Sequence, residues 1–171
     1  TAVQGVLDLT AWDFGKDGNV PLRGQWEFYW GKLLEPDSFT SGDLPQKTGY
    51  GDLSRGWDDF RIHGEKLPVR GFATFRLLVK IPPDNELKSF KIYEVRSVCG
   101  IWVNGQRLAS SGQVGTTEKS ERPTRPLLLP VFMTENRSLE IILQISNFHY
   151  PAAGVYISFG AAANTWKMQR R

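Results

Sequence analysis

Residues 73–81 read Ala-Thr-Phe-Arg-Leu-Leu-Val-Lys-Ile, and this stretch decides the fold. In an extended chain Phe75 and Leu77 fall on one face, whereas Arg76 falls on the other. Such alternation of apolar and polar side chains is typical of a half-buried antiparallel strand. Residues 139–146, Leu-Glu-Ile-Ile-Leu-Gln-Ile-Ser, repeat the pattern, so the sequence predicts two long strands of this kind.

Shorter segments with weaker forms of the pattern bring the expected total to about nine strands. Asn104-Gly105 separates two of them and predicts a type I′ hairpin, because both turn positions need a positive φ. Helical patterns are short: one turn is expected at Asp37–Ser41, and a helix could begin within Ala161–Arg171. The seven further strands are expected at Val3–Leu9, Gln25–Trp30, Phe90–Val95, Ile101–Val103, Arg107–Ser110, Leu127–Val131 and Val155–Phe159.

Length and composition are those of one globular domain, since the chain has 171 residues and 40% of them are hydrophobic. The 17 glycines and 10 prolines interrupt the chain too often for long helices. Leu44–Gly71 and Ser110–Arg125 are rich in turn formers, and loops of that length are usually functional or mobile. The sequence therefore predicts an all-β fold, an antiparallel β-sandwich with long loops at its ends.

Charge and cysteine content exclude several classes of partner and site. A net charge of +3 is too small to indicate a nucleic-acid partner. The longest nearly apolar run, Pro126–Met133, falls far short of the roughly 20 residues that span a bilayer. The single cysteine, Cys99, excludes an intrachain disulfide and a multi-cysteine zinc site.

Catalytic patterns are absent from the sequence. The two histidines, His63 and His149, fall in expected loops, and no Gly-x-Ser-x-Gly elbow or His-x-x-x-His pair occurs. The glycine-rich string Ser111–Gly115 lacks the lysine and the following helix of a phosphate loop. Asp58 and Asp59 are adjacent in a loop, where nothing indicates that they flank a scissile bond. We therefore expect a domain that is not an enzyme, with no cofactor and no metal.

Polar loops suggest binding instead. Trp57 lies in a loop of glycines and aspartates, where an indole could stack on the apolar face of a sugar; alternatively it closes the open end of the sandwich. Asn147, His149 and Tyr150 follow a strand and offer polar groups to a ligand, although they could equally be ordinary turn residues. Arg125 could pair with a carboxylate or hydroxyl, the alternative being a solvated loop charge.

Three strings occur in order at Leu22–Trp30, Gly71–Arg76 and Ile101–Gly105. They resemble the sugar-binding jelly roll that precedes the barrel in bacterial β-galactosidase relatives. Two further strings follow at Ala109–Gly115 and Gln144–His149, and two segments, Gly5–Leu9 and Trp12–Phe14, stand at the start of the chain. With these the chain is more similar still to the extracytoplasmic domain of bacterial seven-transmembrane receptors with diverse intracellular signalling modules. In that group the segment after the string that matches Asn147-Phe148-His149 often has a second glycine. This chain has Ala152-Ala153-Gly154 there.

The resemblance implies a galactose-binding-like sandwich over residues 1–160, followed by a linker, 161–171, that leads toward a membrane span. It implies a non-catalytic sensor outside the cytoplasm, periplasmic or at the cell surface and anchored to the inner membrane. The output would be a cyclase, histidine kinase or phosphatase, and the ligand a small molecule or carbohydrate. The chain begins at Thr1 without Met, as expected for a piece of a longer protein. Alternatives are an accessory module of a secreted glycoside hydrolase and a structural or homodimerising domain.

Sandwiches of this group usually bind ligands through the loops at one end, which the sheets hold in place. We expect Trp57 to stack on the ligand, Asn147 and His149 to hydrogen-bond it, and Arg125 to pair with its most polar edge. The complete predicted site comprises Trp57, Arg125, Asn147, His149 and Tyr150, with Arg76 as a wall residue.

Overall fold

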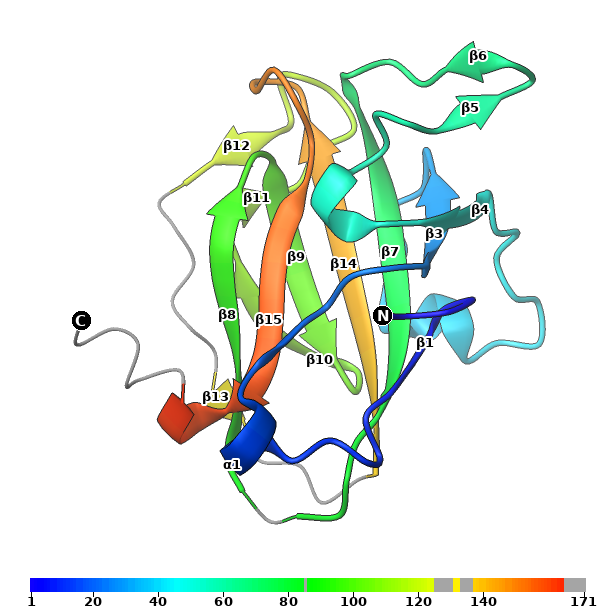
Figure 1. The fold of residues 1–171 in the computed structure, drawn as a ribbon. Coiled ribbons are helices and arrows are strands. Elements are labelled where there is room, and N and C mark those ends of the chain that lie inside the picture. The colour runs from blue at the N-terminus through cyan, green and yellow to red at the C-terminus, as the bar shows by residue number, and fades with distance from the viewer. Residues whose placement is uncertain (85, 125–130, 133–136, 165–171) are drawn as a thin grey trace.

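The chain forms two β-sheets that pack face to face, as Figure 1 shows with β8 and β15 in front of β9 and β10. The computed structural model describes residues 1–84, 86–124, 131–132 and 137–164. Nearly all pairing is antiparallel, the exception among the named strands being β1 beside β7. The predicted all-β antiparallel sandwich is confirmed.

The larger sheet has the strand order β10-β9-β14-β7-β3-β4, and β1 pairs with the far end of β7. β7 and β14 are its centre, paired over their whole length from Gly71↔Asn147 to Lys80↔Ser138. Its strands are β1 (Val6–Asp8), β3 (Trp26–Trp30), β4 (Gly49–Gly51), β7 (Gly71–Lys80), β9 (Val98–Val103), β10 (Gln106–Ser110) and β14 (Ser138–Asn147).

The smaller sheet has the order β13-β8-β15-β2, and two short hairpins lie apart from both sheets. The β5–β6 hairpin projects from one end of the molecule (Figure 1). The smaller sheet comprises β2 (Val20–Pro21), β8 (Lys88–Val95), β13 (Val131–Phe132) and β15 (Val155–Ala161). The hairpins are β5 (Arg61–Ile62) with β6 (Glu65–Lys66), and β11 (Gly112–Gln113) with β12 (Arg122–Pro123).

Helical segments are short, as the sequence predicts. Within the described ranges they are α1 (Phe14–Asp17), two 3₁₀ turns, η1 (Pro36–Phe39) and η2 (Leu53–Arg55), and a helical stretch at residues 162–164. Among the described residues no helix is long and apolar enough to cross a membrane. The helix expected within Ala161–Arg171 lies mostly outside the described residues, as does most of the strand expected at Leu127–Val131.

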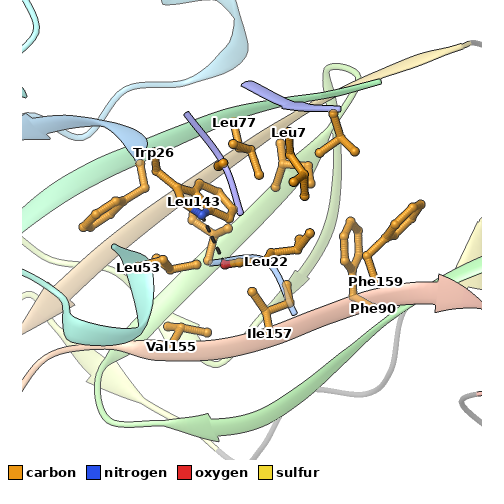
Figure 2. Packing of buried hydrophobic residues seen from close by; sticks show 14 of the residues in the cluster. Leu7, Leu22, Trp26, Leu53, Leu77, Phe90, Leu143, Val155, Ile157 and Phe159 are labelled. Atoms are coloured by element: carbon orange, nitrogen blue, oxygen red, sulfur yellow. Dashed lines mark hydrogen bonds between the residues drawn. The ribbon is translucent and has the colours of Figure 1, made fainter. Parts of the chain in front are cut away.

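The core lies between the two sheets (Figure 2). The alternation at 73–81 and 139–146 is reproduced, because Phe75, Leu77, Leu143 and their inward neighbours are fully buried. Figure 2 shows Leu22 and Leu53 filling the space toward Val155 and Ile157 of the smaller sheet. The hairpin at 104–105 is also confirmed, with positive φ at both turn residues.

Candidate ligand-binding site

Trp57 lies in the core rather than on the surface. Only 1% of the residue is exposed, its Nε1 donates a hydrogen bond to the Pro68 carbonyl at 2.8 Å, and its ring meets Trp30 edge-on at 5.0 Å. Gly56 before it has a φ of +59° and lies against Ala153, so the loop is packed down on the end of the sandwich. The indole offers no ring face to a ligand in this structure, and the alternative interpretation, that it closes the sandwich, describes its position.

Asn147 is also a structural side chain. It is fully buried at the end of β14. Its Nδ2 donates to the carbonyls of Val69 and Tyr150, at 3.2 and 3.0 Å, and its Oδ1 accepts from the Tyr150 amide. These bonds close the turn at 147–150 and leave the amide no group for a ligand.

His149 and Tyr150 are exposed at this end, and His149 contacts a carboxylate that the sequence analysis missed. Its Nδ1 lies 2.7 Å from Oε1 of Glu121, whose side chain is fully buried. Glu121 also accepts hydrogen bonds from the Phe148 amide at 3.0 Å and from the Ser146 hydroxyl. We call Glu121, Ser146, Phe148 and His149 the Glu121 cluster; it ties the loop before β12 to the end of β14.

Arg76 of the predicted site stands apart from this end cluster, as an ion-pair centre on β7. Arg76 bonds Glu140 through Nε and Nη2, at 3.0 and 2.8 Å, and Glu27 through Nη1 at 3.1 Å. Burial alone would lower the pKa of Arg76, but the bonds to these carboxylates outweigh burial and raise it. The Phe39 ring covers the guanidinium at 4.7 Å, so Arg76 is a satisfied ion-pair centre. Arg125 lies outside the described residues.

A hollow of about 510 Å³ opens on the outer face of the larger sheet, where the sequence analysis placed no site. Its floor comes from two rows of paired residues that cross β10, β9 and β14. Trp102 lies between Arg107 and Ile142 in one row. Gly100 lies between Ser110 and Gln144 in the next. We call this feature the Trp102 hollow; its lining includes Trp102, Arg107, Ser110, Gln113, Gln144 and Glu35.

Because Gly100 has no side chain, the space above it is filled by two neighbouring side chains of the floor. A Cβ at this position would lie 3.2 Å from Cζ3 of Trp102 and 3.7 Å from Nη2 of Arg107. Both side chains therefore lie over the glycine, with the Arg107 guanidinium 5.4 Å from the centroid of the Trp102 ring. Any larger residue would press on this pair.

A β-bulge brings Arg107 and Ser110 to the same face of the sheet. Simple alternation would put residues 107 and 110 on opposite faces. The pairing of β10 with β9 shifts between Arg107 and Ala109, so Leu108 is an extra residue and packs against the core. Ser110 then pairs with Gly100 and faces outward beside the indole. Bulges commonly re-aim side chains next to functional sites.

Two segments wall the hollow. On one side the chain after β3 lies across the sheet, because the Leu34 amide donates to Oγ1 of Thr74 and Gln144 donates to the Leu34 carbonyl, both at 2.9 Å. Glu35 follows and faces the hollow. On the other side stands β11, whose loop is held to β14 by a 3.1 Å bond from the Gly115 amide to the Ser146 hydroxyl. The Glu121 cluster therefore fixes one wall.

A second, smaller hollow of about 260 Å³ lies between β2, η2 and β15. Its walls include Arg23 and Tyr156, and its floor is made of Leu22, Val155 and Ile157. Those three apolar residues are at most 4% exposed, so little of their surface is open to a ligand. The Trp102 hollow is the larger and more polar of the two.

Comparison by sequence finds no matching family model and no matching curated protein. Among solved structures the chain is similar to the β-glucuronidase of Ruminococcus gnavus, with 13% identity and a TM-score of 0.56 over 84% of this chain. The complex of that enzyme with D-glucuronic acid matches over the same share, with 12% identity and a TM-score of 0.55. The chain spans 28–29% of the length of these enzymes. At such identities the likeness shows the fold, a β-sandwich that also occurs in glycoside hydrolases.

Proposed function

We propose that this chain is a non-catalytic, extracytoplasmic ligand-sensing domain of a membrane-bound bacterial signalling protein, and that it binds a carbohydrate in the Trp102 hollow. The observation that carries the proposal is the hollow itself. Its volume of about 510 Å³ falls within the 300–1,000 Å³ typical of ligand sites. It lies on the face of a sheet whose central strands are paired throughout, which is a rigid support.

The chemistry of the lining suits a sugar. Trp102 supplies a half-exposed aromatic body, against which the C–H surfaces of a pyranose ring can pack. Ser110 and Gln113 supply neutral hydroxyl and amide groups that can donate to or accept from sugar hydroxyls. A sugar site needs little enclosed apolar surface, because a sugar binds through many polar contacts and through one or two aromatic ring faces.

The sensor assignment is supported by where the family-like strings fall. Ala109–Gly115 contains β11 and forms one wall of the hollow, and Gln144–His149 supplies Gln144 and most of the Glu121 cluster. The strings that set the receptor group apart from other jelly rolls are therefore the ones that shape this site.

Thermal unfolding and calorimetric titration against a panel of neutral and acidic oligosaccharides test the proposal. A sugar at a hundredfold its dissociation constant should stabilise the fold by about 2.7 kcal/mol. Trp102→Ala should remove that stabilisation, whereas Tyr150→Ala, an exposed aromatic at the end-loop cluster, should leave it unchanged. Binding lost in Tyr150→Ala and kept in Trp102→Ala would move the site to the loops. No binding across the panel would overturn the carbohydrate assignment.

The second candidate is an accessory module of a secreted glycoside hydrolase, and the solved structures favour it because they are β-glucuronidases. The two candidates differ in what accompanies this domain in the full-length protein. Apolar membrane spans after Arg171, with a cytoplasmic output that responds to the sugar in vesicles, support the sensor. A catalytic barrel after this domain would establish the accessory module instead.

A further inference from the structure

Arg107 is the cation of the Trp102 hollow, and it has no ion-pair partner among the residues that the structure describes. Its situation contrasts with that of Arg76, which lies in the same row of the sheet three strands farther on. Arg76 is matched by carboxylates of Glu27 and Glu140 at 3.1 and 2.8 Å and is largely buried. Arg107 is exposed and faces the hollow, so its charge is available to a ligand.

The guanidinium of Arg107 is held in place before any ligand arrives. It lies over the Trp102 ring at 5.4 Å, a distance at which the cation is attracted to the ring face. The gap at Gly100 admits both groups, and the bulge at Leu108 keeps Arg107 on this face. An arginine that is already ordered loses less side-chain entropy on binding than a free one.

An ordered guanidinium matches a carboxylate, because its planar fork of N–H donors can bond both carboxylate oxygens at once. Glu35, on the wall formed by the chain after β3, also lines the hollow. A carboxylate is therefore favoured at Arg107 and repelled by Glu35, to which a sugar hydroxyl can donate. Arg107 thus selects an anion, and the neutral and acidic groups of the lining select hydroxyl groups.

We infer that the ligand is an acidic saccharide, a glycan containing uronic acid, whose carboxylate binds Arg107. This inference rests on the proposed function, since it names the class of sugar bound in the same hollow. An amino acid would also offer a carboxylate, but its few polar groups would leave most of a cavity of about 510 Å³ empty.

The test compares matched pairs of ligands by titration calorimetry. The probes are galacturonic, glucuronic and mannuronic acid disaccharides and the corresponding neutral disaccharides of galactose, glucose and mannose. One acidic member should bind roughly 10- to 100-fold more tightly than its neutral counterpart, because hydrogen bonds to charged groups are the strong ones. Added salt should reduce this preference.

The variants assign the preference to one side chain. Arg107→Gln should abolish this preference by reducing the affinity for the acidic sugar to that for its neutral counterpart. Arg107→Lys, which keeps the charge without the planar fork, should retain part of the preference. Arg61→Gln removes an equal charge from the β5–β6 hairpin and serves as the control. Thermal midpoints of all variants verify that they are folded.

The possible results separate this inference from the proposed function. Equal binding of acidic and neutral sugars, unaffected by Arg107→Gln, would overturn the inference and leave carbohydrate binding standing. Failure of every saccharide to bind the folded wild-type chain would overturn both. Tight binding of free amino acids through Arg107, without any saccharide binding, would replace the sugar class with another carboxylate.

Discussion

Replacing Trp57 by alanine tests whether its indole stabilises the fold or binds the ligand. In the structure this side chain is 1% exposed and donates to the Pro68 carbonyl, so Trp57→Ala would leave a large cavity and a carbonyl without its donor. We expect a loss of unfolding free energy with little change in ligand affinity. Trp102→Ala should do the reverse, because Trp102 is only half-buried and lies at the hollow.

The size of the effect follows from burial. Replacing a buried tryptophan by alanine costs about 3–5 kcal/mol of unfolding free energy. For a domain of this length each kcal/mol lowers the thermal midpoint by about 2–4 °C, so the midpoint of Trp57→Ala should fall by about 6–20 °C. Trp57→Phe keeps most of the apolar volume and loses the N–H donor, so its cost should be nearer 1–3 kcal/mol.

Denaturant unfolding and sugar titration on the same preparations give both quantities. The reasoning stands if Trp57→Ala is strongly destabilised, Trp57→Phe less so, and both still bind sugar when folded. It is refuted if Trp57→Ala unfolds within a few degrees of the wild type and no longer binds. That outcome would return the indole to the site and require the loop at 53–70 to open in solution.

Three further predictions follow from single contacts. Glu121→Gln should cost about 1.5–3 kcal/mol of unfolding free energy in denaturant titrations, because a buried carboxylate with three donors is altered, whereas exposed Glu118→Gln should change it by less than about 0.5 kcal/mol. Burial raises the pKa of the Cys99 thiol to about 11, so the unfolded chain ionises first; wild-type stability relative to Cys99→Ala should therefore fall as pH rises from about 9 to 11, and equal slopes would contradict this. Gly100→Val should displace the Trp102 ring and weaken saccharide binding at least tenfold in calorimetry without unfolding the domain, and unchanged affinity would place the ligand elsewhere.

The central strands could be predicted because apolar and polar residues alternate along them, and this alternation indicates which face of each strand is buried. Phe75 and Leu77 alternate with polar residues on β7, and the same holds on β14, so the pattern itself states which face is inward. The hairpin at 104–105 was equally accessible, since its turn needs residues that tolerate a positive φ. Short strands such as β2 and β4 carry no pattern long enough to be recognised.

The end-loop residues were harder to interpret because their environment comes from distant parts of the chain. Trp57 stands among aspartates and glycines, yet Pro68 and Trp30 enclose it. Glu121 lies in a polar stretch that gives no sign of burial, and its partners come from Ser146 at the end of β14 and from Phe148 and His149 just after that strand. The composition of a local segment indicates whether that segment faces solvent. It does not indicate whether residues far away in the sequence cover one of its side chains.

Part of the Trp102 hollow follows from the local sequence pattern, and the rest depends on contacts between segments far apart in the sequence. A two-residue turn at 104–105 already sets Trp102 opposite Arg107, and alternation along β9 turns Gly100 and Trp102 away from the buried Ile101. That half of the floor follows from sequence. The bulge at Leu108, which turns Ser110 to the same face, and the walls, which depend on bonds from Leu34 and Gly115, do not. To predict a binding surface on the face of a sheet, one must know both the register of the strands and the segments that cover them. With only one of the two, Arg107 would be taken for an ordinary exposed charge on an edge strand.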